Sequence, residues 1–302
     1  MKLTESLYIG CLLGLACGDA MGAPFEGGII ERLVWRFIGK TEGGGLRWTD
    51  DTQMSLDLAE SMLAKGALFQ DDLAQRFAGS YHWKRGYGPG AARVLKLIRS
   101  GHNWRDAVHS AYRDGSYGNG AAMRAPVMAL FLPDSLDKLI VNTRAASEIT
   151  HSHLVGIDGA VIIAVATSQL LAHKTSEQVL DVVNMHCQTE ELRSPLRIAT
   201  AWLQQRQTPS ASQVVGQLGN GITAPKSCVT ALYMALRFID AGFVDMMNFA
   251  VACGGDVDTI GAMAGALWGA YNGHTGLPSV DIEERERIEA TARRIYAVVA
   301  GQ

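Results

Sequence analysis

The sequence is poor in cysteine, with only five residues at scattered positions and no Cys-x-x-Cys pair. Disulfide frameworks usually contain an even number of cysteines, and zinc fingers use closely paired ones. We therefore expect reduced thiols and a cytoplasmic protein. Cys253 precedes an acidic segment, but no general base is spaced to activate it. We interpret it as a buried structural thiol rather than a nucleophile.

The sequence also lacks an excess of positive charge. Its 27 lysines and arginines face 30 acidic residues, giving a net charge of −3, and no basic stripe is visible. Nucleic acid is therefore not an expected partner. The longest apolar run, residues 7–22, contains Asp19, and a membrane-spanning helix needs about 20 predominantly apolar residues. We expect a buried helix of a soluble protein there, and no membrane partner.

Signals for β-strands are nearly absent, whereas amphipathic patterns recur along the whole chain. Residues 51–65 place Met54, Leu58 and Met62 on one helical face, and Gly66 ends the pattern. Because 48% of the residues are hydrophobic and no disordered linker interrupts them, we predict one all-α domain over residues 1–302. Further predicted helices cover residues 7–22, 71–83, 91–100, 121–131, 135–150, 155–173, 176–186, 210–218, 226–241, 244–253, 259–271 and 282–299.

Two of these helices contain glycine at every fourth position. The two series are Gly10, Gly14, Gly18, Gly22 and Gly261, Gly265, Gly269, Gly273. A glycine inside a helix costs about 1 kcal/mol relative to alanine, so eight of them need a reason. A row of glycines lets another backbone approach closely. We expect the two helices to pack against each other or against a shared neighbour, which brings the loop after Gly22 near Asp256.

Two acidic segments, residues 48–52 and 254–259, stand at predicted helix starts about 200 positions apart. The first contains Thr49, Asp50 and Asp51. The second contains Asp256 and Asp258, followed by a threonine. A single aspartate at a helix start is commonly an ordinary N-cap, and this interpretation stays open for each. One cap is enough for a helix, however, so each segment carries surplus carboxylates.

If the fold brings both segments together, four carboxylates share one site. Like charges at that density raise the pKa of several of them unless cations neutralise the site. Hard divalent cations bind such all-oxygen ligand sets. The sequence therefore favours a dinuclear Mg²⁺ or Mn²⁺ centre, and with it an enzyme.

Three other features are candidates for ligand binding. Glu26 lies on a glycine- and proline-rich loop, where a glutamate is normally solvated but can also serve a neighbouring metal site. Residues 115–120 precede a helix expected from Ala121, and a glycine-rich loop before a helix suits phosphate. It is no Walker A loop, and an ordinary connection remains open. His151 and His153, two positions apart, could suggest a zinc site, but no cysteine is spaced to complete it, and a simple helix cap is the more common role.

Five motifs occur in an order that resembles the ADP-ribosylglycohydrolase family. Each motif alone is weak, but together they are specific and span essentially the whole chain. They are Gly-Asp-Ala-Met-Gly-Ala-Pro-Phe-Glu at residues 18–26, Trp-Thr-Asp-Asp-Thr at 48–52, Gly-Ser-Tyr-Gly-Asn-Gly-Ala-Ala-Met-Arg at 115–124, Thr-His at 150–151 and Gly-Gly-Asp-Val-Asp-Thr-Ile at 254–260.

The resemblance implies a compact orthogonal helical domain with a dinuclear metal centre holding two Mg²⁺ or Mn²⁺ ions. It places Glu26 beside the metals, Tyr117 near the adenine and His151 in the ribose pocket. The implied metal ligands are Thr49, Asp50, Asp51, Asp256, Asp258 and Thr259. The implied diphosphate and adenosine loop is Gly115, Ser116, Tyr117, Gly118 and Asn119.

The implied activity is hydrolytic removal of ADP-ribose from a modified protein side chain, so the partners are an ADP-ribosylated protein and the ADP-ribose product. Cleavage passes through an oxocarbenium-like transition state, for which Asp258 or Asp256 would orient water. Glu26 would act as a gated acid or base or would position the leaving group. We favour an arginine linkage. A serine linkage, a small ADP-ribosylated metabolite and a silent ADP-ribose binder are the alternatives. Residues 84–90 are the candidate rim of the leaving-group pocket.

Overall fold

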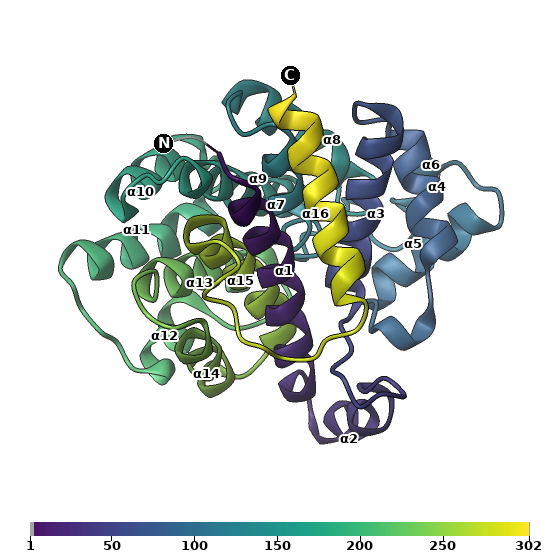
Figure 1. The fold of residues 1–302 in the computed structure, drawn as a ribbon. Coiled ribbons are helices and arrows are strands. Elements are labelled where there is room, and N and C mark those ends of the chain that lie inside the picture. Colours follow the sequence, from purple (N-terminus) through teal and green to yellow (C-terminus); the bar gives the residue numbers. More distant parts are fainter. Residues whose placement is uncertain (1–2, 302) are drawn as a thin grey trace.

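The computed structural model describes residues 3–301. Within that part of the chain the backbone forms no strand and only three isolated bridges, which confirms the all-α prediction. That residues 1–302 form a single domain stays a prediction. The elements shown in Figure 1 are α1 (Glu5–Gly22), η1 (Ala23–Phe25), α2 (Ile29–Ile38), α3 (Asp50–Lys65), α4 (Gln70–Ser80), η2 (Trp83–Arg85), α5 (Pro89–Arg99), α6 (Trp104–Ala107), α7 (Ala125–Phe131), α8 (Leu136–Glu148), α9 (Leu154–Leu171), α10 (Ser176–His186), α11 (Glu190–Gln204), α12 (Ala211–Leu218), α13 (Ala224–Arg237), α14 (Phe243–Cys253), α15 (Val257–Asn272) and α16 (Arg285–Ala300).

Helices α1 and α15 form an antiparallel central pair, joined along the two glycine rows. A Cβ atom added to Gly14 would lie 2.3 Å from the carbonyl oxygen of Gly265, and one added to Gly18 would lie 2.0 Å from that of Gly261. No side chain fits there, so the backbones are in direct contact. The predicted packing of the glycine rows is therefore confirmed.

The antiparallel direction places the end of α1 against the start of α15. A Cβ on Gly22 would lie 2.6 Å from the Cα of Asp258. The chain leaves α1 through η1 and reaches Glu26 directly afterwards. The glycine contact thus brings the loop after Gly22 to the second acidic segment, as the sequence predicts.

Two apolar helical segments are long enough to cross a membrane by length and composition. They are Glu5–Phe25, near the N-terminus, and Leu154–Leu171. In each, 89% of the apolar window is buried inside the protein. Core helices of soluble proteins and signal sequences show the same character, so this composition is weak support for a membrane span.

Several helix boundaries differ from the sequence prediction. Helix α7 begins at Ala125 rather than Ala121, because the carbonyl oxygen of Asn119 accepts hydrogen bonds from the N–H groups of Ala122 and Met123 in a turn. Helix α4 ends at Ser80, because Tyr81 (ψ 121°) leaves the helical conformation. Trp83 therefore lies outside that helix, in η2.

The C-terminal helix also starts later than predicted, at Arg285 instead of Ile282. Ile282 pairs with Leu46 in a parallel bridge, in which the N–H of Glu283 donates to Leu46 and the N–H of Leu46 donates to Asp281. Helices α2, α6 and α11 were not predicted. Helix α11 contains Pro195 in its interior, which makes its sequence unlike a helix.

Candidate active site

The first acidic segment is held at the start of α3 by an aspartate from α1. Asp19 is fully buried, and its carboxylate accepts from the N–H of Thr49 at 2.9 Å and from the Thr52 hydroxyl at 2.6 Å. Asp19 therefore caps the start of α3 from the neighbouring helix α1. Sequence reasoning assigned it no role, although a lone carboxylate in an apolar helix was the available signal.

Asp51 joins the two acidic segments. Its Oδ2 accepts from the hydroxyl of Thr49 at 3.0 Å and from that of Thr259 at 3.4 Å. Its Oδ1 is buried without any hydrogen-bond donor among residues 3–301. Segments that are far apart in the sequence thus meet at this one carboxylate.

The second acidic segment begins with two glycines of positive φ. Gly254 (φ +62°) and Gly255 (φ +78°) end α14 and turn the chain so that the N–H of Asp256 donates to Asn220 at 2.8 Å. Helix α15 begins at Val257, so Asp258 lies in its first turn and is not the N-cap that the ordinary interpretation required.

Neither aspartate of this segment is used for capping. Asp256 occupies the N-cap position, but its side chain forms no capping bond. Its Oδ2 instead accepts a short hydrogen bond from Nδ2 of Asn119. Oδ1 of Asp258 is buried with no donor among the described residues. These are the surplus carboxylates that the sequence indicated.

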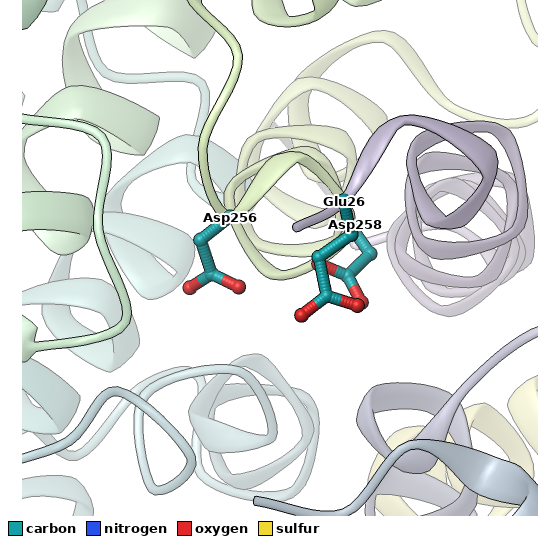
Figure 2. Close-up of side chains that lie close together, drawn as sticks. All are labelled: Glu26, Asp256 and Asp258. Carbon is teal, nitrogen blue, oxygen red and sulfur yellow. The ribbon is translucent and has the colours of Figure 1, made fainter. Parts of the chain in front are cut away.

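Glu26 faces the same carboxylates from the loop after η1 (Figure 2). One oxygen each from Glu26, Asp256 and Asp258 lies within 4.8 Å of the others, a spacing that fits a shared cation. Glu26 is only partly buried, whereas both aspartates are buried. The glutamate is therefore the member of this group nearest to solvent.

Burial sets the electrostatics of the site. It raises the pKa values of Asp51 and Asp258 well above the usual range for aspartate, and the charges of neighbouring carboxylates raise them further. The pKa of Asp50 is raised in the same way. Burial raises the pKa of Asp19 to about 6, although hydrogen bonds from Thr52 and Thr49 oppose the rise. Such a group needs protons or cations to be stable.

The acidic group forms the floor of a pocket that is open to solvent. Thr49 and Asp51 do not line it and are buried behind it, each 1% exposed. The predicted site residues that line the pocket are Glu26, Asp50, Ser116, Gly118, Asn119, His151, Asp256, Asp258 and Thr259. Gly86, Gly88, Pro89 and Gly90 also line it, and they belong to the predicted rim.

The glycine-rich loop forms one wall and leads to a second pocket. That pocket shares Ser116 and Gly118 with the first and is also lined by Tyr117, which is half exposed. Gly115 (φ +82°) faces away, because a Cβ there would lie 2.3 Å from the hydroxyl oxygen of Ser152. The two connected pockets suit an elongated ligand with a ring at the Tyr117 end.

The loop does not run straight into a helix, as the sequence prediction required. It is held instead by the segment before α13, because the N–H of Asn119 donates to Ile222 and the N–H of Ala224 donates to Tyr117. The Asn119 side chain donates to Asp256 and to Ser227, so it orients a carboxylate, and the predicted role of this loop in binding diphosphate stays a prediction. Asn119 is thus a link between the loop and the acidic group.

The two neighbouring histidines have different surroundings. His151 is buried in the pocket wall, where burial lowers its pKa to about 3 and the charge of Arg124 adds to the effect. His153 accepts from the N–H of Val155 with its Nδ1 and caps α9. Cys253 is buried, which raises the pKa of its thiol to about 11, as a structural thiol requires.

Comparison with known proteins gives one family. The model of the ADP-ribosylglycohydrolase family matches residues 2–302. ADP-ribosylhydrolase ARH3 of Homo sapiens is 31% identical over 332 residues, covering 95% of this chain and 91% of its own. The uncharacterized protein YegU of Escherichia coli is 30% identical over 301 residues, covering 88% of this chain and 87% of its own. A solved chain of an "ADP-ribosylglycohydrolase-related protein complex" superposes with a TM-score of 0.72, at 27% identity, covering 99% of this chain and 100% of that chain.

Proposed function

Because the chain belongs to the ADP-ribosylglycohydrolase family, we propose that it is a metal-dependent hydrolase that removes ADP-ribose from a modified side chain. One observation carries the proposal. Oδ1 of Asp51 and Oδ1 of Asp258 are buried without donors at the point where the two acidic segments meet. Buried charged oxygens of this kind are normally paired or bound to a metal.

The donor set fits hard divalent cations. All candidate ligand atoms are oxygens, supplied by Thr49, Thr259 and the aspartates of both segments, with Glu26 beside them. Mg²⁺ and Mn²⁺ prefer such ligands, and no thiolate or imidazole competes in this set. Two ions, bound to Asp50, Asp51, Asp256 and Asp258, would compensate the buried negative charge. When bound, such ions would hold ribose hydroxyls and lower the pKa of a water.

The carboxylates of the chain supply the proton transfers. Asp256 is oriented by Asn119 and Asp258 has an oxygen without a donor, so either can hold the attacking water and take its proton. Glu26, on a loop at the more exposed edge, is placed to assist as an acid or base or to position the leaving group. The reaction breaks the bond between C1″ of the distal ribose and the side chain, the hydroxyl of water attaches to C1″, and the remaining proton goes to the leaving side chain.

The pocket walls supply the binding of ADP-ribose. Its length requires a site that extends beyond the acidic floor, and the second pocket along Ser116 and Tyr117 provides this extension. The half-exposed ring of Tyr117 is available for stacking on adenine. His151 lines the same pocket beside Gly118 and Gly120, and we assign a ribose of the ligand to this part of the wall.

The linkage is the open part of the proposal. Our sequence-based preference for arginine has no support in the relatives, since their names specify hydrolysis of ADP-ribosyl groups and no linkage. The rim at Gly86–Gly90 is the part of the pocket that would contact the leaving group. We therefore propose the hydrolase without restriction to arginine, and treat serine-linked and small-metabolite substrates as direct competitors.

The test is release of free ADP-ribose from two peptides, one modified on arginine and one on serine, with Mg²⁺ and with a chelator. We expect cation-dependent release from at least one of them. Release that persists in the chelator contradicts the metal proposal. No release from either peptide, with ADP-ribose still bound, favours a silent binder, and release only from a small ADP-ribosylated metabolite redirects the substrate class.

A further inference from the structure

Arg124, at the start of α7, is a buried cation without an ion pair. It is 1% exposed, and no ion pair within residues 3–301 includes it. Its guanidinium donates to the carbonyl oxygens of Gly120 and Ala146, and to the hydroxyl of Thr150 at 2.8 Å. Burying a charge without an ion pair costs free energy, and these hydrogen bonds are what offsets that cost.

The bond to Thr150 fixes the direction of a second hydrogen bond. An arginine can only donate, so the Thr150 oxygen is the acceptor and its own proton needs another partner. The Thr150 oxygen also lies 2.8 Å from Nδ1 of His151. Among the hydrogen bonds of residues 3–301, no other acceptor pairs with this hydroxyl. Donation to Nδ1 is the arrangement that gives this proton an acceptor, and it requires an Nδ1 without a proton.

The other ring nitrogen of His151 faces the pocket. A Cβ added to Gly118 would lie 3.2 Å from Nε2, and one added to Gly120 would lie 3.0 Å from it. Both glycines line the pocket, and their lack of side chains leaves this ring edge open. No partner for Nε2 occurs in the described part of the chain. A neutral imidazole that accepts at Nδ1 carries its proton at Nε2.

We propose that Arg124 and Thr150 are positioning residues that hold His151 as the neutral Nε2–H tautomer, so that it donates a hydrogen bond to a ligand oxygen. The charge of Arg124 and the burial of the ring both oppose protonation of the imidazole, which keeps a single donor at this point. The identity of the ligand rests on the proposed function. ADP-ribose offers two classes of acceptor, the phosphate oxygens and the ribose hydroxyls.

The tautomer is measured directly by ¹⁵N NMR of histidine-labelled protein, without any substrate. The signals of His151, among eight histidines, are assigned by their loss in His151→Gln. We expect Nε2–H in the wild type and in Thr150→Ser, which keeps the hydroxyl. Thr150→Val, which is similar in size but has no hydroxyl, should shift the ring toward Nδ1–H. An Nδ1–H signal in the wild type would overturn the proposal, even if the valine variant did not fold.

Binding of ADP-ribose and of AMP then locates the acceptor. Thr150→Val should weaken ADP-ribose binding about tenfold, the scale of one hydrogen bond, and Thr150→Ser should restore it. An equal loss for AMP assigns the acceptor to the adenosine monophosphate part that both ligands share, and a loss for ADP-ribose alone assigns it to the second phosphate or the distal ribose. Wild-type affinity in the valine variant, with Nε2–H retained, would overturn the proposal. Failure of hydrolysis leaves these readouts unaffected, so the two proposals fail separately.

Discussion

Asp258 and Asp158 are both buried aspartates, but their hydrogen bonds differ. Asp158, on α9, accepts from the N–H groups of Gln188 and Thr189 and from the Thr189 hydroxyl, at 2.7 to 2.9 Å for Oδ2. It therefore holds the start of α11. Asp258 has an oxygen without any donor in the described structure. The hydrogen bonds of Asp158 are typical of a structural carboxylate, whereas Asp258 has an oxygen available to bind a cation or to take part in a reaction.

This contrast predicts opposite effects for two matched substitutions. Asp258→Asn should reduce turnover at least about 100-fold, the usual scale for a positioned acid or base, without lowering the stability of the metal-free protein. Asp158→Asn should lower the free energy of unfolding by about 1–3 kcal/mol, because a backbone N–H loses its acceptor, and should keep the turnover. Steady-state rates and urea unfolding measure both. Near-normal turnover in Asp258→Asn would refute its role.

Asp57 predicts a pH dependence of stability. It is 8% exposed in α3, and burial raises its pKa to about 6, although hydrogen bonds from Ser80 and Gln53 oppose the rise. Since the folded pKa exceeds the unfolded one, the contribution to stability is complete below about pH 4 and is lost as the pH rises through about 6.

Asp57→Asn should remove this loss. Relative to the wild type, the variant should gain up to about 3 kcal/mol of unfolding free energy between pH 4 and pH 7.5, from a pKa difference of about 2 units. Urea unfolding in the presence of a chelator measures the difference. Parallel pH dependences of the two proteins would contradict the prediction.

Single residues of the site were predictable only where the chemistry is visible in the sequence. The two acidic segments contain more carboxylates than a helix cap needs, so Asp51 and Asp256 could be found. The bond of Asn119 to Asp256 was not predicted, because it depends on a contact across 137 positions. The roles of Asp19 and Thr150 also depend on such contacts, and no local pattern marks them.

At the scale of the helix, the contact between α1 and α15 predicts that adding a single methyl group at this contact strongly lowers the stability of the fold. Gly14→Ala would place its Cβ 2.3 Å from a carbonyl oxygen of α15 and force the two helices apart. We expect a loss of at least about 1–3 kcal/mol, as for other overpacked cores. Gly216→Ala, on an exposed position of α12 with no atom near its Cβ, should instead gain about 0.5–1 kcal/mol. Equal thermal shifts of the two variants would show that the backbones do not touch.

The same glycine rows explain why the arrangement of the central helices was predictable. Their spacing has a single structural use, close approach, and it specifies which faces meet. The start of α7 was not predictable, because a turn closed by the Asn119 carbonyl replaces the expected first helical turn. Helix α11 was missed because Pro195 lies in its interior, where propensity alone argues against a helix.

For the whole molecule, divalent cations should act as folding ligands. Excess Mg²⁺ or Mn²⁺ should raise the unfolding free energy, by about 2.7 kcal/mol at 100 times the dissociation constant. The gain should increase as the pH rises, because the raised pKa values of Asp51 and Asp258 keep protons on the site at lower pH and a cation needs the ionised form. Thermal melts with and without a chelator test this.

Two variants serve as controls for the cation effect: Asp158→Asn should keep it and Asp258→Asn should reduce it. A pH-independent gain would contradict the assigned ligands.

The pairing of α1 with α15 also determines when during synthesis this molecule can become active. Gly261 emerges from the ribosome about 240 residues after Gly22, and at about 5–20 residues per second this takes on the order of 10–50 s. During that time the glycine face of α1 lacks its partner and the acidic floor of the pocket lacks Asp256 and Asp258. A nascent or prematurely ended chain therefore offers a chaperone an apolar helix, but it has only two of the four aspartates assigned to the proposed metal centre.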